Sequence, residues 1–244
     1  QAMPYSLGSA ALCIAGAILM IRLLRSPVAP AISAAFLPLA LGVTSWWYPV
    51  SIAAVTGVLA VVSAIYGRMF APQVHQTPVS SRNATDDVPD HTPRRSVWVF
   101  AFIGFLLLTY GLATVTGLRL ILFPPLVVIA YEMFARAEVC PWAQRPLALP
   151  LACSIAAGTG VAAIMMLGAG PLSVAAVLLI GIATLRTLRL HMPPALSVGL
   201  LPQIMPQADW HFVLAVAIGA VALSGAFLLA RPSLLNSRGA LGAG

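Results

Sequence analysis

Nine apolar runs, separated by short polar breaks, constrain this sequence more than any other feature. A helix needs about 20 apolar residues to cross the hydrocarbon core of a bilayer, and most of these runs approach that length. Charged residues make up only 8% of the chain, against about 25% in a soluble domain, so they are too few to cover a globular surface. The sequence therefore predicts an all-α membrane protein, a polytopic helical bundle of about nine spans. The runs cover residues 6–24, 29–43, 48–67, 98–116, 119–134, 147–167, 171–188, 193–208 and 211–230.

The basic residues predict how the chain lies in a membrane. All 13 are arginines, and if every run crosses with residue 1 outside, only Arg119 lies on the outer face. Because cytoplasmic loops are enriched in Lys and Arg, we expect a bacterial inner-membrane protein with a cytoplasmic polar linker at 69–97. The five tryptophans lie at run ends and are expected at the headgroup level. The lipid bilayer is the expected partner, a homo-oligomer is left open, and the lack of a basic stripe indicates no nucleic-acid partner.

The sequence contains an internal repeat with an offset of 164 residues. Between positions 22 and 46, nine of 25 residues are identical to those 164 positions later. These residues include arginine, proline and tryptophan, which a shared richness in Leu and Ala does not explain. The matched pairs are Arg22 and Arg186, Leu24 and Leu188, Arg25 and Arg189, Pro30 and Pro194, Ala31 and Ala195, Ser33 and Ser197, Leu37 and Leu201, Pro38 and Pro202, and Trp46 and Trp210.

The repeat predicts how the chain is divided. Residues 1–68 form a partial first repeat of about three spans, and 69–97 is the linker. Residues 98–232 form a second repeat of about six spans, and 233–244 is a tail. Since the first repeat matches only the last three spans of the second, we expect about three more spans upstream in a complete protein. Six is an even number, so both copies should have the same orientation.

The repeated motif, Arg-x-x-Arg followed by Pro-Ala-[Ile/Leu]-Ser, predicts an anion site. Arg186 and Arg189 share one face of a helix end, because residues three apart are neighbours on a helix. Proline is favoured in the first turn of a helix, so Pro193 and Pro194 indicate a new helix start with free N–H groups. Helix starts of this kind bind anions. The predicted substrate-binding residues of the motif are Arg22, Arg25, Pro30 and Ser33 in the first copy, and Arg186, Arg189, His191, Pro193, Pro194 and Ser197 in the second.

Two further segments belong to the predicted site. Residues 193–208 extend only about 24 Å as a helix, and two internal prolines interrupt them. A short, broken helix is tolerated in a bilayer only where protein or water covers its carbonyls, and such helices often line transport sites. A second double proline, Pro124 and Pro125, begins the segment that carries Glu132. These three residues complete the predicted substrate-binding set.

Each candidate also has a simpler interpretation. Arginines at a cytoplasmic helix end often only fix the topology. Glu132 is either a solvated carboxylate paired with Arg136 four residues later or, if buried, an intramembrane functional group. His191 fits a lone interfacial histidine, and the serines fit bonds back to helix carbonyls. Small residues such as Ala156 and Gly160 indicate close helix packing more than chemistry.

The sequence gives no sign of an enzyme. It contains no HExxH, GxSxG or phosphate-loop motif. Its four His are scattered and its three Cys form no CxxC pair, so neither a metal nor another cofactor is expected.

Three stretches of the second repeat carry a family resemblance. They are Leu122-Phe123-Pro124-Pro125-Leu126, Cys140-Pro141-Trp142-Ala143-Gln144-Arg145-Pro146 and His191-Met192-Pro193-Pro194-Ala195-Leu196. They resemble the HPP integral-membrane family, named for a His-Pro-Pro signature followed by Ala, over about residues 118–230. Met192 departs from the signature because it separates His191 from the prolines. Plant chloroplast members are described as nitrite transporters, so the resemblance implies transport of a small anion.

Two functions follow as hypotheses. The leading one is a membrane transporter or channel for a small inorganic anion, with nitrite or nitrate as the best candidate. The alternative is a non-transporting membrane subunit that scaffolds or anchors a larger complex. A transporter needs a polar cavity lined by matched residues of both copies, whereas a scaffold is packed solid there.

Overall fold

The computed structural model describes residues 6–24, 29–70, 97–205 and 207–235. Within these ranges the backbone forms α-helices and short 3-10 helices, with no strand. The prediction of an all-α chain is therefore confirmed for the described residues. The α-helices are α1 (Leu7–Leu23), α2 (Pro30–Leu41), α3 (Trp47–Phe70), α4 (Val97–Thr116), α5 (Pro124–Ala135), α6 (Ala148–Leu167), α7 (Pro171–Thr187), α8 (Pro194–Leu200) and α9 (Trp210–Leu235). The 3-10 helices are η2 (Arg119–Ile121), η3 (Pro141–Gln144) and η4 (Leu201–Gln203).

Four of the described helices, α3, α4, α6 and α9, are long and apolar enough to cross a membrane by length and composition. The other five are shorter: α1 and α7 have 17 residues, α2 and α5 have 12, and α8 has 7. A helix of twelve residues extends about 18 Å, which is less than the hydrocarbon core of about 30 Å. A bundle of nine complete crossings therefore stays a prediction.

Local chemistry sets where the helices begin. Pro30, Pro124 and Pro194 each occupy the first position of a helix, where the missing proline N–H leaves no helical bond unmade. α1 begins instead with a capping box. Ser6 Oγ accepts the Ser9 N–H at 3.2 Å, and Ser9 Oγ accepts the Ser6 N–H at 3.0 Å. Both devices satisfy or remove the N–H groups that a helix start leaves unpaired.

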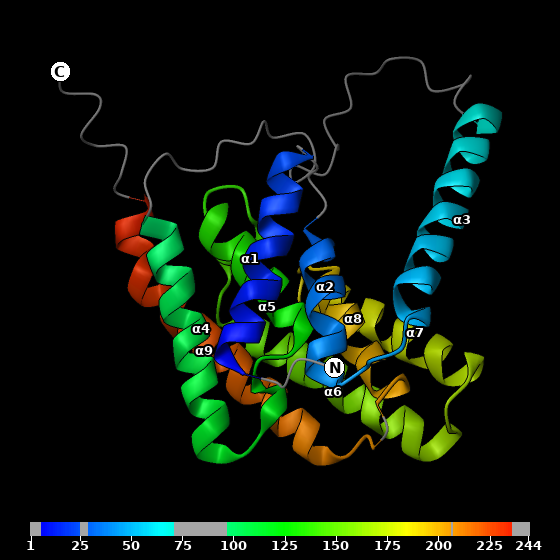
Figure 1. The fold of residues 1–244 in the computed structure, drawn as a ribbon. Helices are drawn as coiled ribbons and strands as arrows, with labels where there is room; N and C mark the ends of the chain where they lie inside the picture. The colour runs from blue at the N-terminus through cyan, green and yellow to red at the C-terminus, as the bar shows by residue number, and fades with distance from the viewer. Residues whose placement is uncertain (1–5, 25–28, 71–96, 206, 236–244) are drawn as a thin grey trace.

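Most helix bounds of the two copies lie at matching positions, 164 residues apart. Leu7 and Leu23, the ends of α1, correspond at an offset of 164 to the ends of α7, and the start of α2 corresponds to the start of α8. α3 and α9, the last helices of the two copies, run in the same direction (Figure 1). These helix bounds and directions agree with two copies of one orientation.

The matched short helices differ in their second half. α2 continues through Pro38 to Leu41, where Gly42, with φ of 69°, ends it. α8 stops at Leu200 and passes into η4, which contains Pro202. The prediction of a short, broken helix in the second copy is thus confirmed for the described residues; Pro206 lies outside them.

α5 and α6 organise the packing of the bundle. α6 contacts α7, α8 and α9, whereas α5 contacts α2, α4, α8 and α9. Every residue of α5 is buried, so this short helix forms the centre of the core. Figure 1 shows α5 behind α1 and α2, with α4 and α9 on one side and α8 on the other. The first copy therefore packs on the second mainly through α2 and α5.

α3 stands apart from this core. None of its most apolar 18 residues is buried, whereas 44% of the corresponding part of α9, its repeat partner, is buried. Figure 1 shows α3 leaning away from the other helices. The Tyr48 hydroxyl, near its start, donates to the Ala34 carbonyl of α2 at 2.7 Å. An apolar helix this exposed is suited to lipid or to another membrane helix, not to water.

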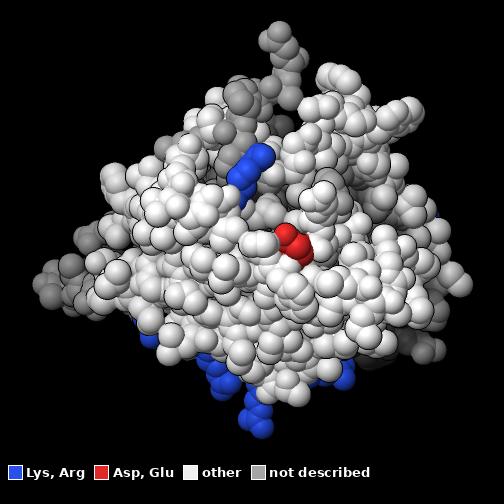
Figure 2. Space-filling view, turned by 90° about the horizontal axis from the view of Figure 1, so that it is seen from below, with Lys and Arg blue, Asp and Glu red and all other residues white. Residues whose placement is uncertain are grey.

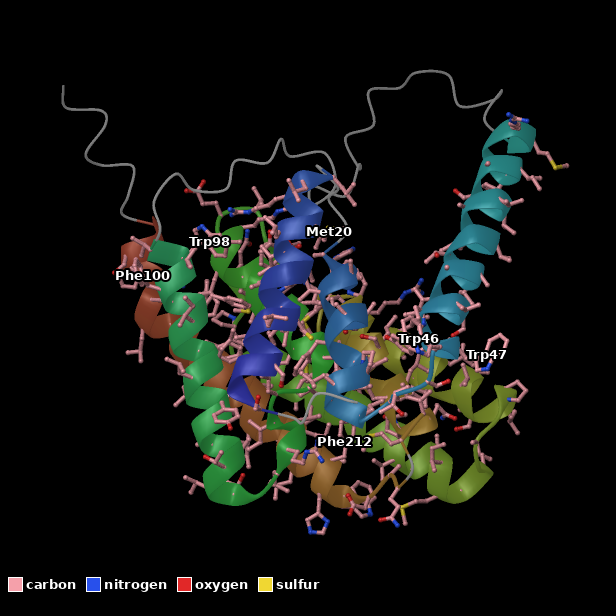
Figure 3. The ribbon with its side chains drawn as sticks, viewed as in Figure 1. Met20, Trp46, Trp47, Trp98, Phe100 and Phe212 are labelled. Atoms are coloured by element: carbon pink, nitrogen blue, oxygen red, sulfur yellow. The ribbon has the colours of Figure 1, made fainter. Side chains whose placement is uncertain are left out.

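The tryptophans fall into two groups. Trp46, Trp47 and Trp210 are exposed at helix starts, where interfacial side chains are expected. Trp98 and Trp142 are only 5% and 4% exposed, so these two rings pack against other parts of the protein. Figure 3 shows Trp98 beside the upper part of α1, far from Trp46 and Trp47 at the base of α3. Tertiary packing places these two rings inside the protein, although both lie near helix ends in the sequence.

Candidate functional site

Glu132 is the only acidic residue in the described α-helices, and it is buried. It lies in the last turn of α5 with 5% of its surface exposed. Glu132 Oε2 lies 3.8 Å from Arg136 Nη1, and the two side chains are 6% and 14% exposed. The predicted pairing with Arg136 is confirmed, but the solvated carboxylate is wrong. The alternative, a carboxylate buried in the bundle, describes the site.

Aromatic rings of α4 and α9 pack on Tyr131 and Phe134 in the last turns of α5. Tyr131 meets Trp98 and Phe102 edge-on, with ring centroids 5.9 and 6.4 Å apart. Phe134 lies 6.5 Å from Phe102 and 6.0 Å from Phe227, which comes from α9. Edge-to-face contacts of this kind fill space densely and exclude water. The side chains of Glu132 and Arg136 are themselves largely buried, and electrostatic interactions are stronger in such surroundings than in water.

The first copy reaches the same region through Arg22. This arginine lies in the last turn of α1, and its guanidinium carbon is 5.4 Å from the centre of the Trp98 ring. A guanidinium above an indole face is held by a cation–π interaction. One predicted arginine of the first copy is thus brought next to the rings that cover α5. Its predicted companion, Arg25, lies outside the described residues.

The predicted residues at the end of α7 lie on the surface. Arg186, Arg189 and His191 are all exposed. Arg189 has φ of 51°, and its N–H donates to the Arg186 carbonyl at 3.1 Å. A non-glycine residue in this left-handed region is uncommon, and here it ends the helix. These three side chains are therefore exposed at the surface and do not form a buried binding site.

The residues of the two proline-started helices have structural roles. Pro193 precedes α8 and Pro194 begins it. The Ser197 hydroxyl donates to the Pro194 carbonyl at 2.7 Å, as the simpler interpretation predicted, so its proton is not offered to an anion. In the first copy Pro30 begins α2, and Ser33 is half-buried with no side-chain hydrogen bond to the described residues. The equivalent serines therefore differ in their surroundings.

α8 packs too tightly on α6 and α7 to leave room for an ion. A Cβ atom added to Gly160 of α6 would lie 2.2 Å from the Gly199 carbonyl oxygen of α8. A Cβ atom added to Gly199 would lie 3.0 Å from the Ala156 carbonyl oxygen. The adjoining cavity holds about 10 Å³, near the lower limit for one water molecule. The prediction that Ala156 and Gly160 mark close helix packing is confirmed.

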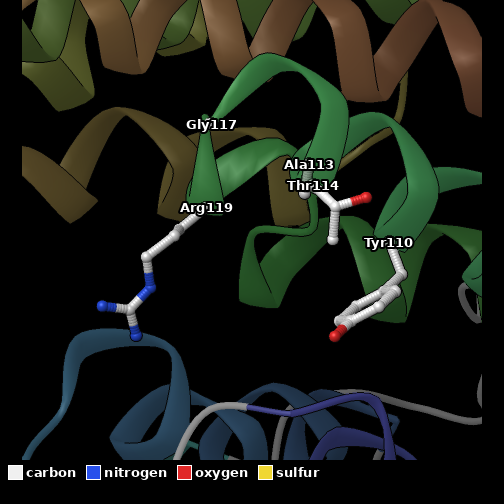
Figure 4. Close-up of a pocket in the computed structure, with 5 residues that line it drawn as sticks. All are labelled: Tyr110, Ala113, Thr114, Gly117 and Arg119. Carbon is white, nitrogen blue, oxygen red and sulfur yellow. The ribbon is translucent and has the colours of Figure 1, made fainter.

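A much larger cavity lies at the opposite end of α4 from Trp98. Its volume is about 520 Å³, and Figure 4 shows the side chains that line it. Figure 2, viewed from this end of the molecule, shows few charged side chains. All the described lining residues belong to the second copy, so this cavity is not the one that the symmetric arrangement predicts. They are Tyr110, Ala113, Thr114, Gly117 and Arg119.

The sequence prediction missed the cavity beside Arg119 and the burial of two tryptophans, and only the first has a signal in the sequence. Arg119 departs from the arginine bias, which marks it as unusual, but its cavity depends on Tyr110 in the preceding helix. The burial of Trp98 and Trp142 has no comparable signal, because a tryptophan at a helix end fits either the interface or the core. Pro124 and Pro125 were predicted as a helix start, and both are buried at the beginning of α5.

The described residues hold no group of three or more His, Cys, Asp or Glu side chains that could bind a metal ion. The closest approach to such chemistry is an exposed pair before and at the start of α9. Asp209 Oδ2 and His211 Nδ1 are 2.8 Å apart, and this hydrogen bond lowers the pKa of Asp209. The pair is formed by one acid and one histidine, so it offers no ligand set.

No family model, no curated protein and no solved structure matches the chain. The class is defined by the fold and the site alone. The described chain is an α-helical protein with four helices of membrane-spanning length and an ion pair buried at the end of its central helix.

The reactivity of Cys140 tests whether the loop after α5 is closed to solvent. It is fully buried, and burial raises the pKa of its thiol to about 12. At neutral pH almost none of it is thiolate, which is the reactive form. In a chain lacking Cys13 and Cys153, we expect a membrane-impermeant maleimide to leave Cys140 unmodified. The exposed residue Gln144 of the same loop supplies the control as Gln144→Cys, which should be labelled; equal labelling by mass spectrometry contradicts the closed arrangement.

Proposed function

We propose that this chain is an integral membrane protein that transports or conducts a small inorganic anion, with nitrite and nitrate as the first ions to test. It would lie in a bacterial inner membrane with the 69–97 linker in the cytoplasm. The observation that carries the proposal is the buried Glu132–Arg136 pair at the end of α5.

An ion pair in this position contributes little to stability. Taking two charges out of water costs several kcal/mol per ion, so apolar side chains of similar volume often stabilise a core equally well. Glu132 is the only acid in the described α-helices, and only 5% of its surface is exposed. Ionisable groups kept inside a membrane protein usually line ion or proton pathways. This favours a functional role for the pair over a structural one.

The chemistry of the pair suits a small oxyanion. Arg136 presents a planar guanidinium with several N–H donors, which binds carboxylates and other planar oxyanions in the same way. Nitrite and nitrate are planar oxyanions that can replace the Glu132 carboxylate beside Arg136. Protonation of Glu132 would remove the carboxylate charge that competes with the anion beside Arg136. We therefore propose that nitrite or nitrate takes the place of the Glu132 carboxylate beside Arg136.

The predicted surface arginines have a supporting role in this proposal. Arg186 and Arg189 are exposed, and Arg22 lies over Trp98. Clustered positive charges attract anions from solution and raise their local concentration. We expect these arginines to speed the approach of the anion on the cytoplasmic side, while the buried pair determines whether it passes.

The test is anion uptake into proteoliposomes made with the purified chain. Nitrite and nitrate uptake should exceed that of protein-free liposomes and should saturate with concentration. Sulfate, which is larger and carries two charges, serves as the comparison ion and should be taken up more slowly. Uptake of no small anion above the protein-free level would sink the proposal.

Two observations favour a second function, that of a membrane subunit anchoring other membrane helices. One is the tight packing of α8 on α6 and α7 at the repeated motif, where a transporter needs a polar cavity; the other is the exposed face of α3. α3 has no buried residue in its apolar part, although α9, its repeat partner, packs on α4 and α6. Ala53, Gly57, Ala60 and Ala64 follow one another at helical spacing on one face, and small residues let helices approach closely in a bilayer. The occupant of this face would be a membrane helix packed as α6 packs on α9.

The two functions are separated by the mass of the protein extracted from its own membrane. The anchoring function expects a complex that dissociates when Ala60→Leu enlarges the small-residue face, but not when Val62→Leu enlarges the opposite face. A monomeric protein with saturable anion uptake supports transport instead.

A further inference from the structure

We propose that each anion crosses together with one proton, which Glu132 carries as a neutral carboxylic acid. This inference rests on the proposed function and deepens it, because it names the second substrate of the same site and the ratio of the two. The protein is then a proton–anion symporter. The observation behind it is a single acid beside a single guanidinium, on and just after a helix that is buried along its whole length.

The charges of the pair are balanced before an anion arrives. Glu132 Oε2 and Arg136 Nη1 are 3.8 Å apart, and their opposite charges sum to zero. An anion beside Arg136 while Glu132 is ionised gives this largely buried site a net negative charge, which is costly where water does not solvate it. One proton on Glu132 forms an O–H bond and returns the sum to zero. The balance therefore requires one proton for each anion.

Glu132 has no open surface to which its charge could move. It lies in the last turn of α5, where every residue is buried, and α2, α4, α8 and α9 pack around this helix. Figure 1 shows α5 inside the bundle, behind α1 and α2. The Arg136 N–H donates to the Glu132 carbonyl at 3.0 Å, which holds the two residues in one helical turn. Protonation is the change that relieves the repulsion without moving the helix.

The helices that pack on α5 hold no second acid. α2 and α8 contain no titratable side chain, α4 contains only Tyr110, and α9 contains only His211 and Arg231. Tyr110 lies about 18 Å along α4 from Trp98, which meets α5. His211 lies about 24 Å along α9 from Phe227, which also meets α5. Arg231 is exposed and already carries a positive charge.

The loop after α5 and the end of α1 supply no substitute for Glu132. Cys140 is close enough to interact electrostatically with the pair, but burial raises the pKa of its thiol to about 12, so it has no charge to lose. Glu138 is exposed, and water screens its charge. Arg22 and Arg145 are exposed cations. The proton that balances the anion therefore binds to Glu132.

The coupling gives the anion affinity a defined pH dependence. Protonated Glu132 is the form that accepts the anion, and its population rises as the pH falls. Proton binding and anion binding strengthen each other by the same factor. Because one proton is taken up with each anion, we expect the KM for the anion to fall by up to about tenfold for each unit by which the pH is lowered.

The experiment measures nitrate uptake and proton entry together, in wild-type proteoliposomes that contain a pH-sensitive dye. Nitrate is the probe because nitrous acid, the protonated form of nitrite, crosses lipid without a protein. We expect saturable uptake with one proton entering for each nitrate. A membrane potential imposed with potassium and valinomycin should not change the rate, since the two charges cancel, whereas an acidic outside solution should raise it.

Glu132→Gln identifies the carrier of the proton, because the amide has a similar size and does not ionise. We expect this variant to move nitrate without protons, at a rate that no longer depends on pH and now responds to the membrane potential. Glu138→Gln, which changes an exposed carboxylate six residues later, is the control and should keep the proton entry and the pH dependence.

The other outcomes separate this inference from the proposed function. Saturable nitrate uptake by the wild type without proton entry rejects the coupling and keeps transport, and this result does not depend on whether any variant folds. Uptake of neither nitrate nor protons rejects both. One proton for each nitrate in Glu132→Gln would show that another group carries the proton, which overturns the assignment to Glu132.

Discussion

Gly160→Ala is expected to lower the apparent melting temperature of the purified protein by about 5–10 °C. The added Cβ atom would lie 2.2 Å from the Gly199 carbonyl oxygen and 3.0 Å from the Pro202 ring. Because the nearest atom belongs to the backbone, no side-chain rotation relieves the contact, and α6 and α8 must separate. Overpacking of this kind costs about 1–3 kcal/mol in a well-packed core.

A matched control lies two residues away on the same helix. A Cβ atom added to Gly158 meets only Trp210 at 3.9 Å, an ordinary van der Waals distance. Gly158→Ala should therefore leave the melting temperature unchanged or raise it slightly, since alanine favours a helix. Equal melting temperatures for Gly160→Ala and Gly158→Ala would mean that α6 and α8 are not in backbone contact.

Glu132→Leu is expected to destabilise the protein strongly, whereas the double variant Glu132→Leu with Arg136→Leu should fold nearly as well as the wild type. Removing one member of a buried pair leaves the other charge uncompensated, at a cost of about 3–5 kcal/mol. Arg136 keeps 14% of its side chain exposed, so we expect the lower end of that range. Replacing both members with apolar groups removes the buried charge altogether.

The measurement is denaturant unfolding in detergent, with Glu138→Leu as the control. Glu138 is an exposed glutamate just beyond α5, and since exposed ion pairs contribute only about 0–1 kcal/mol, its replacement should change the free energy of unfolding by no more than about 1 kcal/mol. If the double variant is as unstable as Glu132→Leu, the pair stabilises the fold itself, and the reason for assigning it a function is lost.

The helix bounds were largely predictable because they depend on local chemistry. Pro30 and Pro194 mark helix starts by the loss of a donor, and that signal is visible without any tertiary contact. The polar breaks between the apolar runs also predict the number of α-helices in the described residues, because each run contains one helix. The length of the helix within each run was less predictable. An apolar run has the same composition whether its helix crosses the membrane or ends inside the bundle.

Which face of a helix is buried was not predictable for this chain. In a soluble helix, polar residues mark the exposed side, but α3 and α9 are apolar all round. Their sequences therefore do not reveal that α9 packs on α6 while α3 packs on little. The difference comes from which helices surround each one, and that is a property of the whole fold.

The candidate site was predicted only in part for the same reason. The spacing of Glu132 and Arg136 shows that they can pair, but their burial depends on the helices that pack around α5. The opposite holds for Arg186 and Arg189, whose recurrence in both copies singles them out although their side chains are exposed. A repeated motif shows which residues recur, and the packing decides whether they meet a ligand.

The most direct test of the account compares nitrite uptake by proteoliposomes containing the wild type, Arg136→Gln or Arg231→Gln at matched protein density. Both substitutions remove an arginine of the same face, but only Arg136 belongs to the buried pair. We predict uptake at the wild-type rate for Arg231→Gln and at about one tenth of it or less for Arg136→Gln. Equal uptake by all three would contradict a pathway that passes the Glu132–Arg136 pair.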